Sequence, residues 1–203
     1  MVRENEEEYR ERFPFRHGDP VEVIVGSLDW FRAHAEVASE TEWNRYTFAH
    51  VRVELDKTGG EIQRLVDAKG KLPPGAAPKI AAEALDAYIN SYYRSAKNFR
   101  DGDPVAGRLD AAESAPYFLV TLFALHERVR PYNKYLRWEL EQHPLPGDEW
   151  SAARLLPTLE AVVAGDLDAQ RALFRALERL ARERGHGEVV DAWGDDVAWL
   201  RGP

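Results

Sequence analysis

The sequence predicts an α+β fold, in which a partial mixed sheet with helices over residues 1–72 precedes an all-helical carboxyl-terminal domain over residues 73–203. Three observations lead to this prediction. Short β-branched runs bounded by turn residues alternate with helical periodicity in the first part. Apolar residues in the second part recur three or four apart, as on one face of a helix. Between the two parts, residues 69–78 concentrate glycine and proline, which favour a domain boundary.

The first part predicts two strands and two helices. Residues 21–25 (VEVIV) form a β-branched run that ends at Gly26, and residues 50–55 alternate and end in a glycine turn. Helical spacing predicts helices over residues 29–37 and 61–68. A two-stranded sheet is only marginally stable, since three or more strands on a helix are usually needed. We therefore expect the sheet to be completed by another chain or by a segment that precedes this sequence.

The second part predicts five helices, over residues 80–99, 104–125, 134–142, 149–164 and 167–184. Asp103 marks the start of the second of them, and Pro116 predicts a kink within it. Beyond the kink, residues 118–125 are apolar all round, which predicts a buried helix. Asp166 is expected to cap the last long helix, and Gly185 is expected to end it.

Composition excludes several classes of protein. A hydrophobic fraction of 44% with 31% charged residues excludes an intrinsically disordered chain. No apolar run reaches the roughly 18 to 20 residues of a membrane span, and the start lacks a signal peptide, so we expect a cytoplasmic protein without a membrane partner. With no cysteine, disulfides and thiolate metal sites are excluded. The net charge of −8 argues against general nucleic-acid binding but permits a local basic pocket for a phosphate-bearing small molecule.

Glu22 is the acidic side chain that the sequence singles out, because its neighbours in the predicted strand are mostly β-branched. Two interpretations of this residue stay open. The first is a half-buried strand with one solvated face. The second is a metal ligand or general base, since ionisable groups in apolar surroundings often mark functional sites.

Basic side chains gather in two stretches of the helical part. Tyr93, Arg94 and Lys97, with Arg100 beyond them, lie near the end of the first helix, where cations three residues apart can face a triphosphate. Cations at the carboxyl end of a helix also stabilise the helix itself, which is the alternative. The second stretch, residues 128–134, follows the buried helix and ends in a lysine.

Several motifs carry a resemblance to a known family. In the helical part they are residues 92–97 (YYRSAK), 109–114 (LDAAES), 122–125 (LFAL) and 130–136 (RPYNKYL). This part looks like the carboxyl-terminal domain of bacterial nucleotidyltransferases of the DNA polymerase beta superfamily, which include the group that adenylylates aminoglycosides and lincosamides. The predicted strand with Glu22 resembles the strand that carries the third active-site carboxylate of those enzymes. Residues 51–56 with their glycine turn resemble the closing element of the same catalytic domain.

The resemblance implies nucleotidyl transfer from ATP or another nucleoside triphosphate to a hydroxyl of a small molecule, with Mg2+ as the metal ion. It implies Glu22 as base or metal ligand. It also implies Lys97 and Lys134 as phosphate-binding residues, with Tyr93 and Arg94 nearby.

The chain departs from the family in the metal site. Such enzymes carry a Gly-Ser loop and an Asp-x-Asp pair upstream of the third carboxylate, and this sequence has neither before Glu22. Because one carboxylate cannot hold two Mg2+ ions, we expect the 203-residue chain alone to be catalytically inactive.

Two alternative functions stay open. The first is a noncatalytic interaction or nucleotide-binding module whose open sheet pairs with another chain, which includes pairing in a homodimer. The second is a helical-bundle ribonuclease, because Arg137 and His143 stand a few residues apart, as an arginine and a histidine do in such enzymes.

Overall fold

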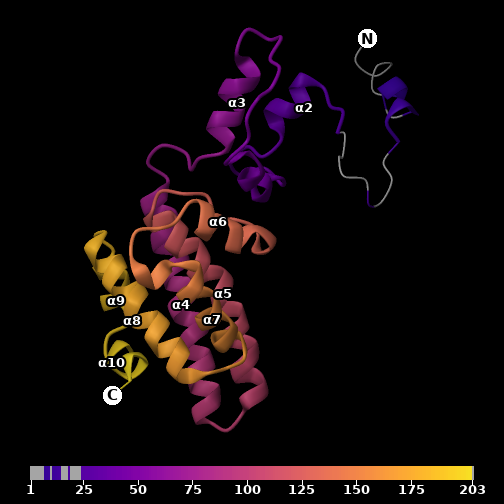
Figure 1. Cartoon of the computed structure of the whole chain (residues 1–203). Helices are drawn as coiled ribbons and strands as arrows, with labels where there is room; N and C mark the ends of the chain where they lie inside the picture. The colour runs from indigo at the N-terminus through magenta and orange to yellow at the C-terminus, as the bar shows by residue number, and fades with distance from the viewer. Residues whose placement is uncertain (1–6, 10, 15–17, 19–23, 203) are drawn as a thin grey trace. The chain divides into compact units, whose positions relative to one another are not determined.

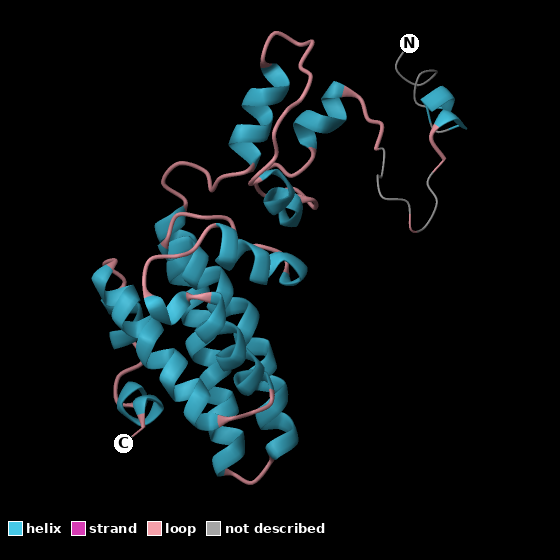
Figure 2. Cartoon of the chain, viewed as in Figure 1, coloured by secondary structure: helices cyan, strands magenta, loops and turns pink. Residues whose placement is uncertain are grey.

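In the part of the chain that the structure describes, all regular secondary structure is helical (Figure 2). The computed structural model describes residues 7–9, 11–14, 18 and 24–202. The predicted α+β fold is therefore wrong, because these residues contain no sheet. Of the nucleotidyltransferase architecture that the resemblance implies, the helical bundle alone is found.

The two expected strands have different outcomes. Residues 50–55 form irregular backbone, and Val51 and Leu55 are 43% and 70% exposed, so their side chains do not pack on the inner face of a sheet. A strand needs a neighbour for its backbone N–H and C=O groups, and no strand among the described residues offers one. Residues 21–23, and with them Glu22, lie outside the described residues, while Ile24 and Val25 are irregular.

The chain divides after Lys69 into two units. The first unit contains α2 (Leu28–Ala33), the 3-10 helix η1 (Glu42–Phe48) and α3 (Glu61–Lys69) (Figure 1). The second unit begins at Gly70 and contains the remaining described helices. They are α4 (Ala77–Arg100), α5 (Pro104–Leu125), η2 (Asn133–Tyr135), α6 (Leu136–Gln142), η3 (Asp148–Trp150), α7 (Ala152–Val163), α8 (Leu167–Glu183), α9 (Gly187–Asp191) and α10 (Asp196–Arg201).

The first unit buries few apolar side chains. Among its described residues, the buried apolar side chains are Ala35, Tyr46 and Val66. By contrast, Ile24 is 70% exposed and Trp43 is 69% exposed. Because burial of apolar surface is the main stabilising contribution in folding, this unit gains little from it.

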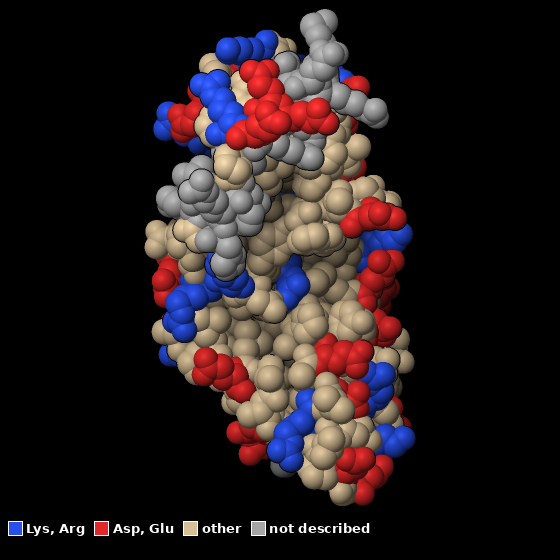
Figure 3. Space-filling view, turned by 90° about the vertical axis from the view of Figure 1, so that its right-hand side faces the viewer, with Lys and Arg blue, Asp and Glu red and all other residues tan. Residues whose placement is uncertain are grey.

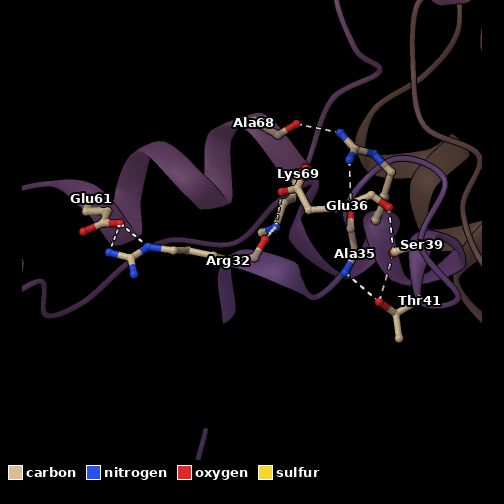
Figure 4. Close-up of polar contacts among 9 residues, drawn as sticks. Arg32, Ala35, Glu36, Ser39, Thr41, Glu61, Ala68 and Lys69 are labelled. Atoms are coloured by element: carbon tan, nitrogen blue, oxygen red, sulfur yellow. Dashed lines mark hydrogen bonds and ion pairs between the residues drawn. The ribbon is translucent and has the colours of Figure 1, made fainter. Parts of the chain in front are cut away.

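Buried cations hold the first unit together instead. Lys69 is 1% exposed, and its Nζ donates to Glu36 Oε1 at 2.6 Å (Figure 4). Arg45 is also buried and donates to the backbone carbonyls of Ala35 (3.0 Å) and Ala68 (2.7 Å). These bonds tie the segment after α2 to the carboxyl end of α3, where positive charge is favourable.

α4 and α5 form the antiparallel hairpin around which the second unit is built (Figure 1). Asp103 caps α5 as predicted, since its side chain accepts from the backbone N–H groups of Val105 (3.2 Å) and Ala106 (3.0 Å). Gly107 permits the two helices to approach closely, because a Cβ atom at this position would lie 2.8 Å from the ring of Phe99. α5 then continues through Pro116 to Leu125.

Aromatic side chains fill the core between this hairpin and α8. The rings of Tyr88 and Phe118 have centres 5.7 Å apart, and those of Tyr92 and Phe174 have centres 5.5 Å apart. The Tyr92 hydroxyl donates to the Leu200 carbonyl at 2.7 Å, which fastens α10 to this core. A buried tyrosine needs such a partner for its hydroxyl.

The two ends of α8 follow the prediction. Asp166 accepts from the backbone N–H groups of Asp168 and Ala169, both at 2.9 Å. After the helix, Gly185 has a φ of +85°, a backbone conformation that favours glycine.

Candidate functional site

A groove of about 600 Å3 runs between the η2–α6 segment and α7. Four of its lining side chains are apolar, and we call these four the floor of the groove, while the other four are polar. The lining residues are Asn133, Lys134, Leu136, Arg137, Leu156, Leu159, Glu160 and Val163. The volume falls within the range of about 300–1,000 Å3 that is usual for small-molecule sites.

The α7 side of the groove follows from helical spacing. Leu156, Leu159, Glu160 and Val163 stand three or four residues apart, so they share one face of the helix. α7 has 12 residues, whereas α6 has 7, so α6 covers part of this face. Leu159 is 8% exposed and Val163 is 48% exposed, which leaves the carboxyl end of α7 open to solvent.

On the opposite side, an arginine fixes the orientation of Asn133. Arg130 Nη2 donates to Asn133 Oδ1 at 2.6 Å, so the amide nitrogen Nδ2 is the end of Asn133 that can donate to a ligand. Burial lowers the pKa of Arg130, and its Nε is buried without a hydrogen-bond partner among the described residues. A guanidinium nevertheless keeps its charge in a protein. Arg130 therefore adds positive potential beside the groove.

Two further cations line the same side. Lys134 Nζ lies 5.4 Å from the centre of the Tyr135 ring. Arg137 Nη1 lies 3.8 Å from Glu141 Oε1, with the two side chains 65% and 49% exposed. An ion pair of this length and exposure is weak, so the Arg137 guanidinium can readily exchange it for an anion. Glu160 is the carboxylate on the facing side of the groove.

The structure does not bring the predicted nucleotide-binding residues together. Tyr93 packs against Trp193 and Trp199, with ring centres 5.8 and 5.6 Å away. Arg94 turns toward α5, where its Nη2 lies 3.1 Å from an oxygen of Asp110 and also bonds Glu113.

The two predicted lysines lie apart. Lys97 is exposed and sits one turn before the end of α4. Lys134 lies in η2, the short helix directly before α6, and α6 lies toward the other end of the α4–α5 hairpin (Figure 1). Only Lys134 is in the groove, and Glu22 falls outside the described residues.

Arg137 and His143, the two residues on which the ribonuclease alternative rests, have different surroundings in the structure. Arg137 lines the groove. The His143 ring packs at 5.3 Å on Trp138, and the His143 carbonyl accepts from Arg128 Nη1 at 2.7 Å. Arg128 also bonds the buried Glu139, so this cation of the second basic stretch has a structural role.

Sequence reasoning missed Arg137 as a groove residue and missed the whole α7 side. The signal for α7 was present, because Leu156, Leu159 and Val163 have the spacing of one apolar helix face. Spacing alone does not reveal which part of such a face stays uncovered. That depends on the short length of α6.

A second, smaller cavity of about 250 Å3 lies between the end of α5, the loop before η3 and α8. It is lined by His126, Glu149, Arg179, Glu183 and Arg184, among others. Within the described ranges, no three histidine, aspartate or glutamate side chains are grouped so that they could hold a metal ion.

The comparisons with known proteins add no assignment. No family model, no curated protein and no solved structure matches the chain. Among the helices that the structure describes, none has the length and apolar composition to cross a bilayer.

Proposed function

We propose that the second unit binds a phosphate-bearing small molecule with an apolar part, such as a nucleoside phosphate, in the groove between η2–α6 and α7. One observation carries this proposal. Three side chains that can donate hydrogen bonds, Asn133, Lys134 and Arg137, line the same side of one groove. Phosphate oxygens accept hydrogen bonds from such groups, and the bonds are strongest where the donor is charged.

The floor of the groove suits the rest of such a ligand. Leu136, Leu156 and Leu159 offer apolar surface next to the donors. Burial of apolar ligand surface contributes about 25 cal/mol per Å2, so a planar ring on this floor adds to the affinity that the phosphate provides. The binding mode then places the phosphate on Lys134 and Arg137 and the ring against α7.

This function corresponds to the nucleotide-binding alternative from the sequence, with a helical groove in place of an open sheet. Lys134 is the one residue predicted to bind the nucleotide that also belongs to the proposed site, and Asn133 and Arg137 are new members of this site. Nucleotidyl transfer, its Mg2+ ion, its small-molecule acceptor and a cytoplasmic location stay predictions from the sequence.

Isothermal titration calorimetry with ATP tests the proposal, with EDTA present so that the protein side chains alone contact the phosphates. We expect Lys134→Gln and Arg137→Gln each to weaken binding about five- to tenfold, because each removes a charge-assisted hydrogen bond worth about 1–1.5 kcal/mol at an open site. The affinity should also fall with added salt, since the contacts are ionic.

Lys97→Gln is the matched control. Lys97 is an exposed lysine of the same unit that lies outside the groove. Its substitution should leave the ATP affinity unchanged. The proposal fails if the wild-type chain does not bind ATP, or if Lys97→Gln costs as much affinity as Lys134→Gln.

A further inference from the structure

The outer face of α5 carries a stripe of apolar side chains, three of which are exposed, whereas that of Ala112 is half-buried. Val105, Leu109, Ala112 and Pro116 stand four, three and four residues apart, which is the spacing of one helix face, and we call them the α5 stripe. Val105 is 65% exposed and Leu109 is 68% exposed. Figure 3 views the molecule from the side on which α5 lies in Figure 1, and residues other than lysine, arginine, aspartate and glutamate cover part of this face between charged ones.

The stripe has the pattern of a two-stranded coiled-coil seam. Alternating steps of four and three residues are the heptad spacing that lets two helices pack along each other. The exposed side chains of Val105 and Leu109 stand one helical turn apart, so they are neighbours on the surface of α5. Apolar side chains that lie next to each other on a surface indicate a binding partner more than single scattered ones do. The seam therefore fits a helix as its partner.

The charges that flank the stripe are complementary to those of a second copy. At 100° per residue, Arg108 and Glu113 lie on opposite sides of the stripe, five positions apart. In a parallel helix pair, side chains at these two positions of opposite helices meet across the seam. In an antiparallel pair, each meets its own counterpart, which would place like charges together.

Both flanking side chains are accessible for such contacts. Arg108 is exposed, its Nε donates to the Pro104 carbonyl at 3.0 Å, and no carboxylate within the described ranges forms an ion pair with it. The Glu113 side chain is 49% exposed and bonds Arg94. A carboxylate can accept from two cations, so the bond to Arg94 leaves room for a second arginine.

We propose that a second copy of this chain packs on the α5 stripe, with the two α5 helices parallel and Arg108 of each copy paired with Glu113 of the other. The interface is independent of the groove between η2–α6 and α7. It gives the chain a self-association surface of its own.

Sedimentation equilibrium of the full chain at concentrations up to about 200 μM tests this inference. We expect the wild type to dimerise and Leu109→Lys to weaken the dimer at least about tenfold, because a charge replaces the central apolar contact. Leu55→Lys is the matched control, since Leu55 is 70% exposed and lies outside the stripe. It should leave the association constant unchanged.

Charge reversal tests the parallel arrangement. Arg108→Glu and Glu113→Arg each create like-charged pairs and should weaken the dimer about fivefold, whereas the double variant should restore it to within about twofold of wild type. Circular dichroism checks that each variant keeps its helices. A monomeric wild type, an equal loss in Leu55→Lys, or a double variant no better than the singles would overturn the inference.

Discussion

Arg201 Nε donates to Glu178 Oε2 at 2.9 Å, which joins the last helix of the described chain to α8. Arg182 Nε donates to the other oxygen, Oε1, at 2.9 Å. The Glu178 side chain is 7% exposed, so its charge is held inside the protein by the two arginines. The hydrogen bonds from Arg201 and then Arg182 lower the pKa of Glu178.

Substitution of this carboxylate should destabilise the second unit. We expect Glu178→Gln to lower the free energy of unfolding by about 1–3 kcal/mol, because two partly exposed arginines lose their shared ionised acceptor. Urea unfolding followed by circular dichroism measures the change. Glu160→Gln, at an exposed position, is the control and should change the free energy by less than about 0.5 kcal/mol. Equal effects of the two substitutions would contradict this role for Glu178.

The surroundings of His126 in the folded chain favour its neutral form. Its Nδ1 lies 2.8 Å from the Leu122 carbonyl, so Nδ1 carries the hydrogen and donates it. Nε2 is buried and has no hydrogen-bond partner among the described residues. Burial, together with the positive charges of Arg184 and Arg128, lowers the pKa of His126.

This lowered pKa predicts the direction of a pH effect. The unfolded chain binds the His126 proton more readily than the folded chain, so stability is complete above about pH 6.5 and falls as the pH decreases from there toward the folded pKa. We expect the free energy of unfolding to decrease between about pH 7.5 and 5.5, and His126→Gln to remove part of that decrease. Urea titrations across this range measure it, with His186→Gln as control. An unchanged slope in His126→Gln would argue against this origin.

Gln170 offers a route to a more stable protein. The residue is 1% exposed, and both its Oε1 and its Nε2 are buried with no hydrogen-bond partner in the described part of the chain. Since an unsatisfied buried amide costs about 1–3 kcal/mol, we expect Gln170→Met, which has a similar shape, to raise the free energy of unfolding by about 1 kcal/mol. Gln142→Met, on an exposed position of α6, should not raise it. Thermal unfolding of both variants compares them, and a less stable Gln170→Met would refute the expectation.

The first unit should open more easily than the second. It is held by the buried cations Lys69 and Arg45 more than by apolar side chains. Native-state hydrogen exchange should therefore give smaller opening free energies for amides of α3 than for those of α4 and α5. Comparable protection in all three helices would show that the first unit has a stronger core than its buried residues indicate.

The helix ends could be predicted from sequence because the signals are local. Asp103 and Asp166 accept hydrogen bonds from the backbone two and three residues ahead, and Gly185 takes its positive φ within one turn. The outcome at residues 50–55 could not be predicted from local signals. A segment of alternating apolar and polar residues forms a strand only where another strand is available to pair with it.

Of the residues that line the groove, one was predicted from the sequence to bind a ligand. Lys134 stands in the motif of residues 130–136, and the family resemblance that this motif carries implied a phosphate-binding role for it. Arg137 lines the groove together with Lys134, and Leu156 and Val163 line its opposite side. This arrangement depends on how α6 packs on α7. Contacts between helices of this kind are set by the whole core and not by the spacing within one helix.

The backbone of the second unit can report directly whether a phosphate-bearing ligand binds between η2–α6 and α7. Backbone amide chemical shifts of the isotope-labelled chain, recorded during titration with ATP in EDTA, locate the ligand most directly. We expect the largest shifts at residues 133–137 and along the α7 face at Leu156, Glu160 and Val163, with little change around Lys97. Shifts that centre on Lys97 and the end of α4, or no shifts at all, would contradict the proposed binding site.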